Sequence, residues 1–212
     1  MANLSELYDA ILKGNRDKAV KTTEAALAEG VDPQEIVTKY MIPAMDEVGK
    51  RFECNEYFVP ELLIAARAMK ACLEKVKPLL VAAGAKPSGR VAIGTVKGDL
   101  HDIGKNLVAA MLEGGGFEII DLGVDVSPER FAEAVKDKGA NIVCLSALLT
   151  TTMPSMKGTI EALKEAGLRG NCKVMIGGAP VTQQYADEIG ADGYSENAAG
   201  AVNLARKLVG AA

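Results

Sequence analysis

The stretch Arg90-Val-Ala-Ile-Gly-Thr-Val-Lys-Gly-Asp-Leu-His-Asp-Ile-Gly-Lys-Asn106 marks the point where the hydrophobic pattern of the chain changes. It begins with a short β-branched run, Arg90 to Thr95, which is typical of a buried strand. From Ile103 onward apolar residues recur at helical spacing. The loop between them carries His101, the only histidine in the chain. In an open α/β sheet such a loop lies at the carboxyl edge of a strand, where ligands usually bind.

Downstream of this loop, short strand patterns alternate with amphipathic helix patterns. Alternation of this kind predicts a parallel sheet with helices on both faces, and the expected strand order is 2-1-3-4-5, the flavodoxin-like (Rossmann-type) arrangement. The fold class is therefore α/β with a five-stranded parallel sheet. The predicted strands are Arg90–Thr95, Phe117–Leu122, Asn141–Leu145, Lys173–Ile176 and Gly193–Tyr194, and the predicted helices cover 103–113, 128–138, 154–166, 181–189 and 198–209.

Upstream of this loop, the sequence indicates only helices. Asp32-Pro33-Gln34-Glu35 is a strong helix start, with Asp32 as the cap and Glu35 expected to reach back as in a capping box. Helices joined by short turns predict a four-helix bundle over residues 1–86, followed by the α/β domain over 87–212. The turn-rich segment Gly84 to Gly89 is the expected joint and a candidate hinge. The predicted helices cover about 4–12, 16–29, 33–52 and 57–83.

Composition narrows the class of protein. The 212 residues are 49% hydrophobic and 25% charged, which is typical of a folded globular chain. A net charge of -4 argues against nucleic acid as a partner, because no basic surplus is present. No signal peptide or membrane-spanning run is visible, so no membrane partner is expected. The four cysteines form no Cys-x-x-Cys pair and are expected to be reduced thiols in a cytoplasmic protein.

The loop around His101 has the residues of a single-ligand metal site. Asp99 can accept a hydrogen bond from one imidazole nitrogen and leave the other free to bind a metal. Gly98 and Gly104 remove side chains on either side, as the close approach of a large ligand requires. A single histidine cannot hold a bare metal ion, but it can give one axial bond to a metal in a macrocycle. The same position also suits a hydrogen-bonded structural histidine.

Two further loops are predicted at the same edge of the sheet. The third strand is followed by Ser146-Ala-Leu-Leu-Thr150-Thr-Thr152, which presents hydroxyls on a short apolar stretch. The fourth is followed by Gly177-Gly178-Ala-Pro180, where the two glycines are expected to leave a gap against the sheet. With the loop of His101, these segments surround the point where the strand order reverses.

These motifs together resemble a known family. Gly98-Asp99-x-His101-x-x-Gly104, then Ser146-x-Leu148, then Gly177-Gly178 is similar to the three-part signature of cobalamin-binding domains that hold the corrinoid by a protein histidine. Upstream, Pro43 to Phe52 and Tyr57 to Leu63 resemble the helical cap domain of methionine synthase and of the corrinoid proteins of anaerobic methyltransferase systems. The resemblance covers nearly the whole chain.

The resemblance implies a set of site residues. His101 would be the lower axial ligand of cobalt in place of the nucleotide base (base-off/His-on). Asp99 and Thr152 would complete a relay with it, and Thr152 stands where the family has serine. Ser146 and Thr150 would bind the nucleotide tail near Gly177 and Gly178, with Leu148 packed against it. The remaining implied cofactor contacts are Gly98, Leu100, Asp102, Ile103 and Gly104, with Phe58 and Leu62 of the cap over the upper face.

The resemblance also implies a function. The chain would be a cobalamin methyl carrier that shuttles a methyl group between a substrate-specific methyltransferase and a second methyltransferase acting on tetrahydrofolate or coenzyme M, with a reductive activator. It would be a non-catalytic subunit of that system. Three alternatives stay open: a cobalamin-dependent sensor or regulator, the small subunit of a carbon-skeleton mutase, and a flavodoxin-like domain without corrinoid. The methyl donor also stays open among methanol, methylamines, glycine betaine and aromatic methyl ethers.

Overall fold

A computed structural model describes residues 3–84 and 87–210, and the chain divides into two compact units. The first comprises Met1–Pro87 with Glu113–Gly116, and the second comprises Ser88–Leu112 with Phe117–Ala212. The end of the predicted helical domain at residue 86 and the middle of the predicted hinge fall on residues 85 and 86, which lie outside the described residues. Within the described ranges, no helix combines the length and hydrophobicity that crossing a membrane requires.

The helical unit contains the four predicted helices, in which Leu7, Ile11 and Ile36 are fully buried. They are α1 (Leu4–Leu12), α2 (Arg16–Ala28), a third helix made of α3 (Pro33–Ile36), η1 (Val37–Met41) and α4 (Ile42–Glu53), and α5 (Val59–Ala82).

The third helix begins as predicted but differs in two details. Asp32 caps it by accepting a hydrogen bond from the Gln34 N–H at 3.1 Å. The expected capping box is wrong, because the carboxylate of Glu35 pairs with Lys39 at 2.9 Å one turn further along. A π-helical turn, Val37–Met41, precedes Pro43, which has no N–H to donate to an α-helical bond.

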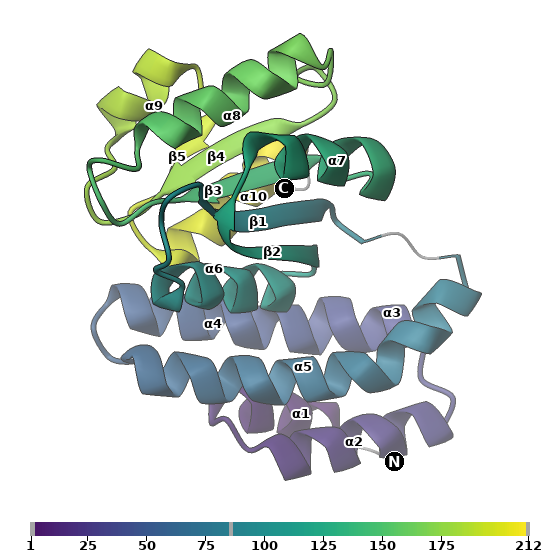
Figure 1. Ribbon diagram of the computed structural model, residues 1–212. Helices are drawn as coiled ribbons and strands as arrows, with labels where there is room; N and C mark the ends of the chain where they lie inside the picture. Colours follow the sequence, from purple (N-terminus) through teal and green to yellow (C-terminus); the bar gives the residue numbers. More distant parts are fainter. Residues whose placement is uncertain (1–2, 85–86, 211–212) are drawn as a thin grey trace. The chain divides into compact units, whose positions relative to one another are not determined.

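The α/β unit contains a five-stranded parallel sheet in the order β2-β1-β3-β4-β5, which confirms the predicted topology. In Figure 1, α7, α8 and α9 cover one face of this sheet and α6 and α10 the other. The strands are β1 (Arg90–Val96), β2 (Glu118–Val126), β3 (Ile142–Ser146), β4 (Lys173–Gly177) and β5 (Gly193–Tyr194), and the helices are α6 (Ile103–Gly114), α7 (Pro128–Lys138), α8 (Pro154–Glu165), α9 (Gln183–Ile189) and α10 (Ala198–Val209).

Strand β2 is longer than predicted. The sequence pattern was expected to end at Leu122, but the strand continues to Val126. Gly123 has a φ of 86°, and the register of β1 against β2 shifts on either side of its partner Gly94. These irregularities carry the strand past the glycine and place Asp125 at its carboxyl end.

The close packing of β1 against α7 predicts that Gly94→Ala destabilises the fold. A Cβ at this position would lie 2.9 Å from Cζ of the buried Phe131. Overpacking of this kind costs about 1–3 kcal/mol of unfolding free energy, measured by urea denaturation. Gly158→Ala in α8 is the control, because its Cβ would meet no atom within 4 Å and alanine favours helix. Equal stability of Gly94→Ala and the wild type would contradict the packing argument.

Candidate functional site

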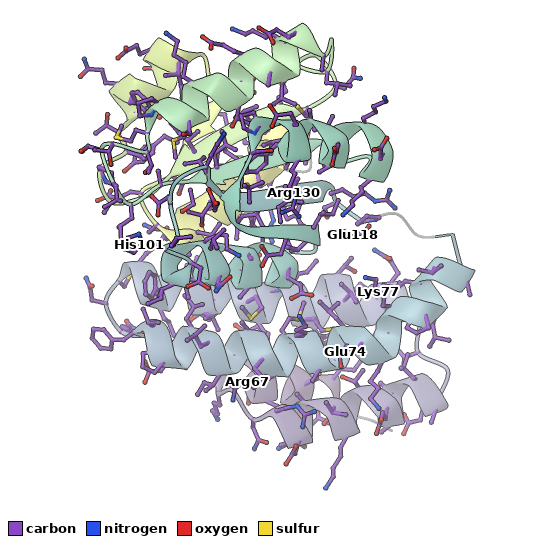
Figure 2. The ribbon with its side chains drawn as sticks, viewed as in Figure 1. Arg67, Glu74, Lys77, His101, Glu118 and Arg130 are labelled. Atoms are coloured by element: carbon purple, nitrogen blue, oxygen red, sulfur yellow. The ribbon has the colours of Figure 1, made fainter. Side chains whose placement is uncertain are left out.

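The loop from β1 to α6 begins with a tight turn. The Asp99 N–H donates to the Val96 carbonyl at 3.1 Å, and Gly98 has a φ of 85°, in the left-handed region that favours glycine. Asp99 is fully buried, whereas His101 is half-exposed and lies where the loop enters α6 (Figure 2).

The carboxylate of Asp99 is fully buried and joins two loops. Its Oδ1 accepts the backbone N–H of His101 at 3.1 Å and lies 2.9 Å from the ring Nδ1 of His101. Its Oδ2 accepts the Leu148 N–H at 2.8 Å and the Thr152 hydroxyl at 2.7 Å, with the Leu149 N–H at 3.4 Å. The structure therefore brings together the three residues of the predicted relay.

These contacts decide the charge of Asp99 and the tautomer of His101. Burial alone would raise the pKa of the Asp99 carboxyl, but hydrogen bonds from Leu148, Thr152 and His101 outweigh it and hold the pKa well below its ordinary 3.8. An ionised carboxylate only accepts hydrogen bonds, so the ring hydrogen of neutral His101 resides on Nδ1. The lone pair is then on Nε2, which has no hydrogen-bond partner among the described residues. The side chain is 53% exposed.

The surroundings of His101 suit a metal that is already held by a macrocycle. Among the described residues, no group of three or more His, Cys, Asp or Glu side chains could hold a bare ion. Two large apolar side chains flank the histidine, Leu100 at 71% and Ile103 at 82% exposure. A Cβ on Gly104 would meet no atom within 4 Å, so the space beside the main chain is open. One nitrogen donor with an apolar, uncrowded rim fits a large flat cofactor.

The loops after β3 and β4 meet each other closely. A Cβ on Gly178, whose φ is 133°, would lie 1.8 Å from the carbonyl oxygen of Ala147. The Ala147 N–H in turn donates to the Gly177 carbonyl at 3.2 Å. The gap that was expected beside the two glycines is therefore filled by main chain. Of the other predicted tail-binding residues, Ser146, the last residue of β3, is half-buried, and Leu148 and Thr150 in the following loop are exposed.

The two predicted contacts in the helical unit differ in exposure. Phe58 precedes α5 and is 61% exposed, and its N–H donates to the Glu61 carboxylate at 3.0 Å. Leu62, one turn into the helix, is fully buried. Their role as a cover of the cofactor stays a prediction. Asp102 lies in the His101 loop and accepts a hydrogen bond from the side-chain amide of Asn106 at 3.0 Å.

Sequence reasoning missed two residues that hold the His101 loop. The Thr95 hydroxyl donates to the His101 carbonyl at 2.7 Å, and the Asp125 carboxylate accepts the Gly98 N–H at 2.7 Å. Both residues are polar and lie at the carboxyl ends of strands, β1 and β2. That position was the available signal, but the sequence pattern places Thr95 within the predicted strand and predicts that β2 ends before Asp125.

The network around Asp99 predicts a pH-dependent contribution to stability. Asp99→Asn places an amide against donors and should lower the unfolding free energy at neutral pH by about 2 kcal/mol. Because the folded-state pKa of Asp99 is lowered, its stabilisation is complete above the ordinary value of 3.8 and is lost as the pH falls below it. Urea denaturation at several pH values should show that the unfolding free energies of Asp99→Asn and wild type differ by a constant amount above about pH 5. This difference should become smaller as the pH falls below 3.8. Asp102→Asn is the control, because Asp102 is exposed. An unfolding free-energy difference between Asp99→Asn and wild type that grows in acid would contradict the prediction.

Comparisons with known proteins identify the family of the chain. Two sequence models, each described as a B12 binding domain, match residues 4–77 and 89–203. Dimethylamine corrinoid protein 1 of Methanosarcina acetivorans is 46% identical over 207 residues, which is 97% of each chain.

Two solved structures are similar over nearly the whole chain. A cobalamin-binding protein from Desulfitobacterium hafniense is 35% identical with a TM-score of 0.80, over 98% of this chain and 99% of that one. A chain of the methanol:cobalamin methyltransferase complex MtaBC from Methanosarcina barkeri is 30% identical with a TM-score of 0.87, over 99% and 80% of the two chains. The chain therefore belongs to the cobalamin-binding corrinoid proteins of methyltransferase systems.

Proposed function

We propose that this protein is a methyl carrier whose cobalt is bound from below by His101. In this function the chain accepts a methyl group through a substrate-specific methyltransferase and delivers it through a second methyltransferase. The observation that carries the proposal is the environment of the only histidine. Its Nδ1 is held by a buried carboxylate, and its Nε2 lies on a half-exposed ring and has no hydrogen-bond partner within residues 3–84 and 87–210. Such an outer carboxylate orients a metal-binding imidazole and raises its basicity.

The residues around the cofactor have distinct roles in this proposal. When bound, the corrinoid supplies the cobalt that takes up and gives up the methyl group. His101 donates the Nε2 lone pair, Asp99 fixes the ring, and the Thr152 hydroxyl holds Asp99 from the other side at 2.7 Å. An imidazole not bound to the metal would be held in the same orientation by the ionised Asp99, which lies 2.9 Å from its Nδ1. Threonine at 152 thus makes the contact that the family's serine would make.

The nucleotide tail is assigned to the loops after β3 and β4. Ser146 and Thr150 offer hydroxyls, and Leu148 offers an apolar side chain that is 42% exposed. We expect the tail to follow the surface of these loops, because main chain fills the space directly beside Gly177 and Gly178.

The proposed partners follow from the relatives. A relative with 46% identity is a dimethylamine corrinoid protein, and a similar solved structure is a methanol:cobalamin methyltransferase complex. We therefore propose a methylamine or methanol methyltransferase as the donor enzyme, and a second methyltransferase acting on coenzyme M or tetrahydrofolate. A reductive activator is a further expected partner, because accidental oxidation of the cobalt would otherwise stop the cycle.

Axial ligation can be tested through the single histidine. Labelling all histidine with ¹⁵N labels only His101. The protein is loaded with cobalamin, reduced to the Co(II) state and examined by electron paramagnetic resonance. A bond from His101 should turn the nitrogen superhyperfine triplet of the unlabelled protein into a doublet, because ¹⁵N has spin one half. A triplet in the labelled protein would show that the cofactor's own base is the ligand and would contradict the proposal. His101→Ala is the control and should show no doublet.

Methyl transfer can be tested with the enzymes of relatives. The cobalamin-loaded, reduced protein is mixed with a dimethylamine- or methanol-dependent methyltransferase and ¹³C-methyl substrate, and label in the extracted corrinoid is measured. We expect labelling with at least one donor enzyme. His101→Ala should be labelled more slowly, since its cofactor is held less firmly. No labelling in either reaction, while the relative's own corrinoid protein is labelled, would contradict the proposed methylamine or methanol methyltransferase as the donor enzyme.

A further inference from the structure

The peptide that carries His101 is held from the sheet side by Thr95. This residue is fully buried at the carboxyl end of β1, where it pairs with Ser146 of β3. Its hydroxyl donates to the His101 carbonyl at 2.7 Å. A buried hydroxyl without a partner is costly, so this hydrogen bond is a firm link between the strand and the loop.

The two hydrogen bonds on the main chain of His101 together fix its conformation. The N–H belongs to the peptide plane before the residue and is bound by Asp99 Oδ1 at 3.1 Å. The carbonyl belongs to the plane after it and is bound by Thr95. Since φ and ψ are the only soft backbone dihedrals of a residue, holding both planes fixes the direction of the Cα–Cβ bond. The imidazole therefore leaves the loop in a set direction before any cofactor binds.

The first half of the loop has its own anchor. The Gly98 N–H donates to Asp125 Oδ1 at 2.7 Å, and the Asp125 N–H donates to the Asp99 carbonyl at 3.0 Å. Asp125 thus holds the main chain on both sides of the Gly98–Asp99 peptide. For the second half of the loop, the hydroxyl of Thr95 provides the corresponding anchor on the sheet.

We propose that Thr95 is a positioning residue for the axial ligand: its hydroxyl aims the His101 imidazole at the cobalt without touching the cofactor. The inference rests on the proposed function, because it presupposes that His101 binds the metal. A histidine that is held less firmly binds a metal more weakly, because the neighbouring residues that fix its orientation are part of the metal site.

The test compares variants with and without the hydroxyl. Thr95→Val and Thr95→Ala remove it, and Thr95→Ser keeps it. Thr159→Val is the matched control, because Thr159 is an equally buried threonine whose hydroxyl donates to the Ser155 carbonyl at 2.8 Å within α8. The ¹⁵N-histidine proteins are loaded with cobalamin, and two quantities are measured: the doublet fraction of the Co(II) signal and the Kd for hydroxocobalamin. Urea denaturation records the stability of each variant.

The expected result is specific to the hydroxyl at position 95. Thr95→Val and Thr95→Ala should lose most of the doublet and bind hydroxocobalamin about tenfold more weakly. Thr95→Ser and Thr159→Val should stay close to wild type in both quantities, even though Thr159→Val loses stability. If Thr95→Val fails to fold, Thr95→Ala, which cannot overpack the site, gives the same comparison.

The failures of the two hypotheses are distinguishable. A wild-type protein without the doublet would contradict His101 ligation itself. The role of Thr95 alone would be overturned if folded Thr95→Val or Thr95→Ala kept the full doublet and a Kd for hydroxocobalamin within about twofold of wild type. Equal losses in Thr159→Val would show that the effect follows stability alone and would also overturn it.

Discussion

The site depends on the burial of one carboxylate. Asp99 is fully enclosed, and a charge in that position is tolerated only when donors surround it. The donors come from the loops after β1 and β3, which meet because these two strands are neighbours in the sheet. The strand order thus brings the hydrogen-bond donors to Asp99, and the Asp99 carboxylate joins the two loops.

The same carboxylate sets the chemistry of His101. Its Oδ1 accepts a hydrogen bond from Nδ1–H of the neutral ring, so the lone pair lies on Nε2. Its Oδ2 is saturated by Leu148 and Thr152, which prevents Asp99 from turning away. Thr95 and Asp125 hold the main chain of the loop from the neighbouring strand ends. Protein contacts alone therefore orient the imidazole, as the proposed bond from His101 to cobalt would require.

Sequence reasoning predicted the strand order, the helices and the pairing of His101 with Asp99, because these depend on periodicity and on short spacing along the chain. It missed the extension of β2, since Gly123 interrupts the hydrophobic pattern while its positive φ lets the strand continue. Asp125 was missed as an anchor of the His101 loop for the same reason, because it lies in the extended part of β2. Thr95 was missed because alternation reports which face a side chain occupies and not which carbonyl its hydroxyl meets. The gap expected at Gly178 was wrong because a glycine can also admit the main chain of another loop.

The contact between Gly178 and Ala147 has a mechanical consequence. Ala147 stands immediately before Leu148, whose amide holds Asp99, and the carbonyl of Ala147 rests directly on Gly178. The two consecutive residues Ala147 and Leu148 thus connect the glycine turn after β4 to the carboxylate of Asp99. A substitution that displaced the turn at Gly178 would therefore also displace the Leu148 amide, and with it one of the hydrogen bonds that keep the buried carboxylate ionised.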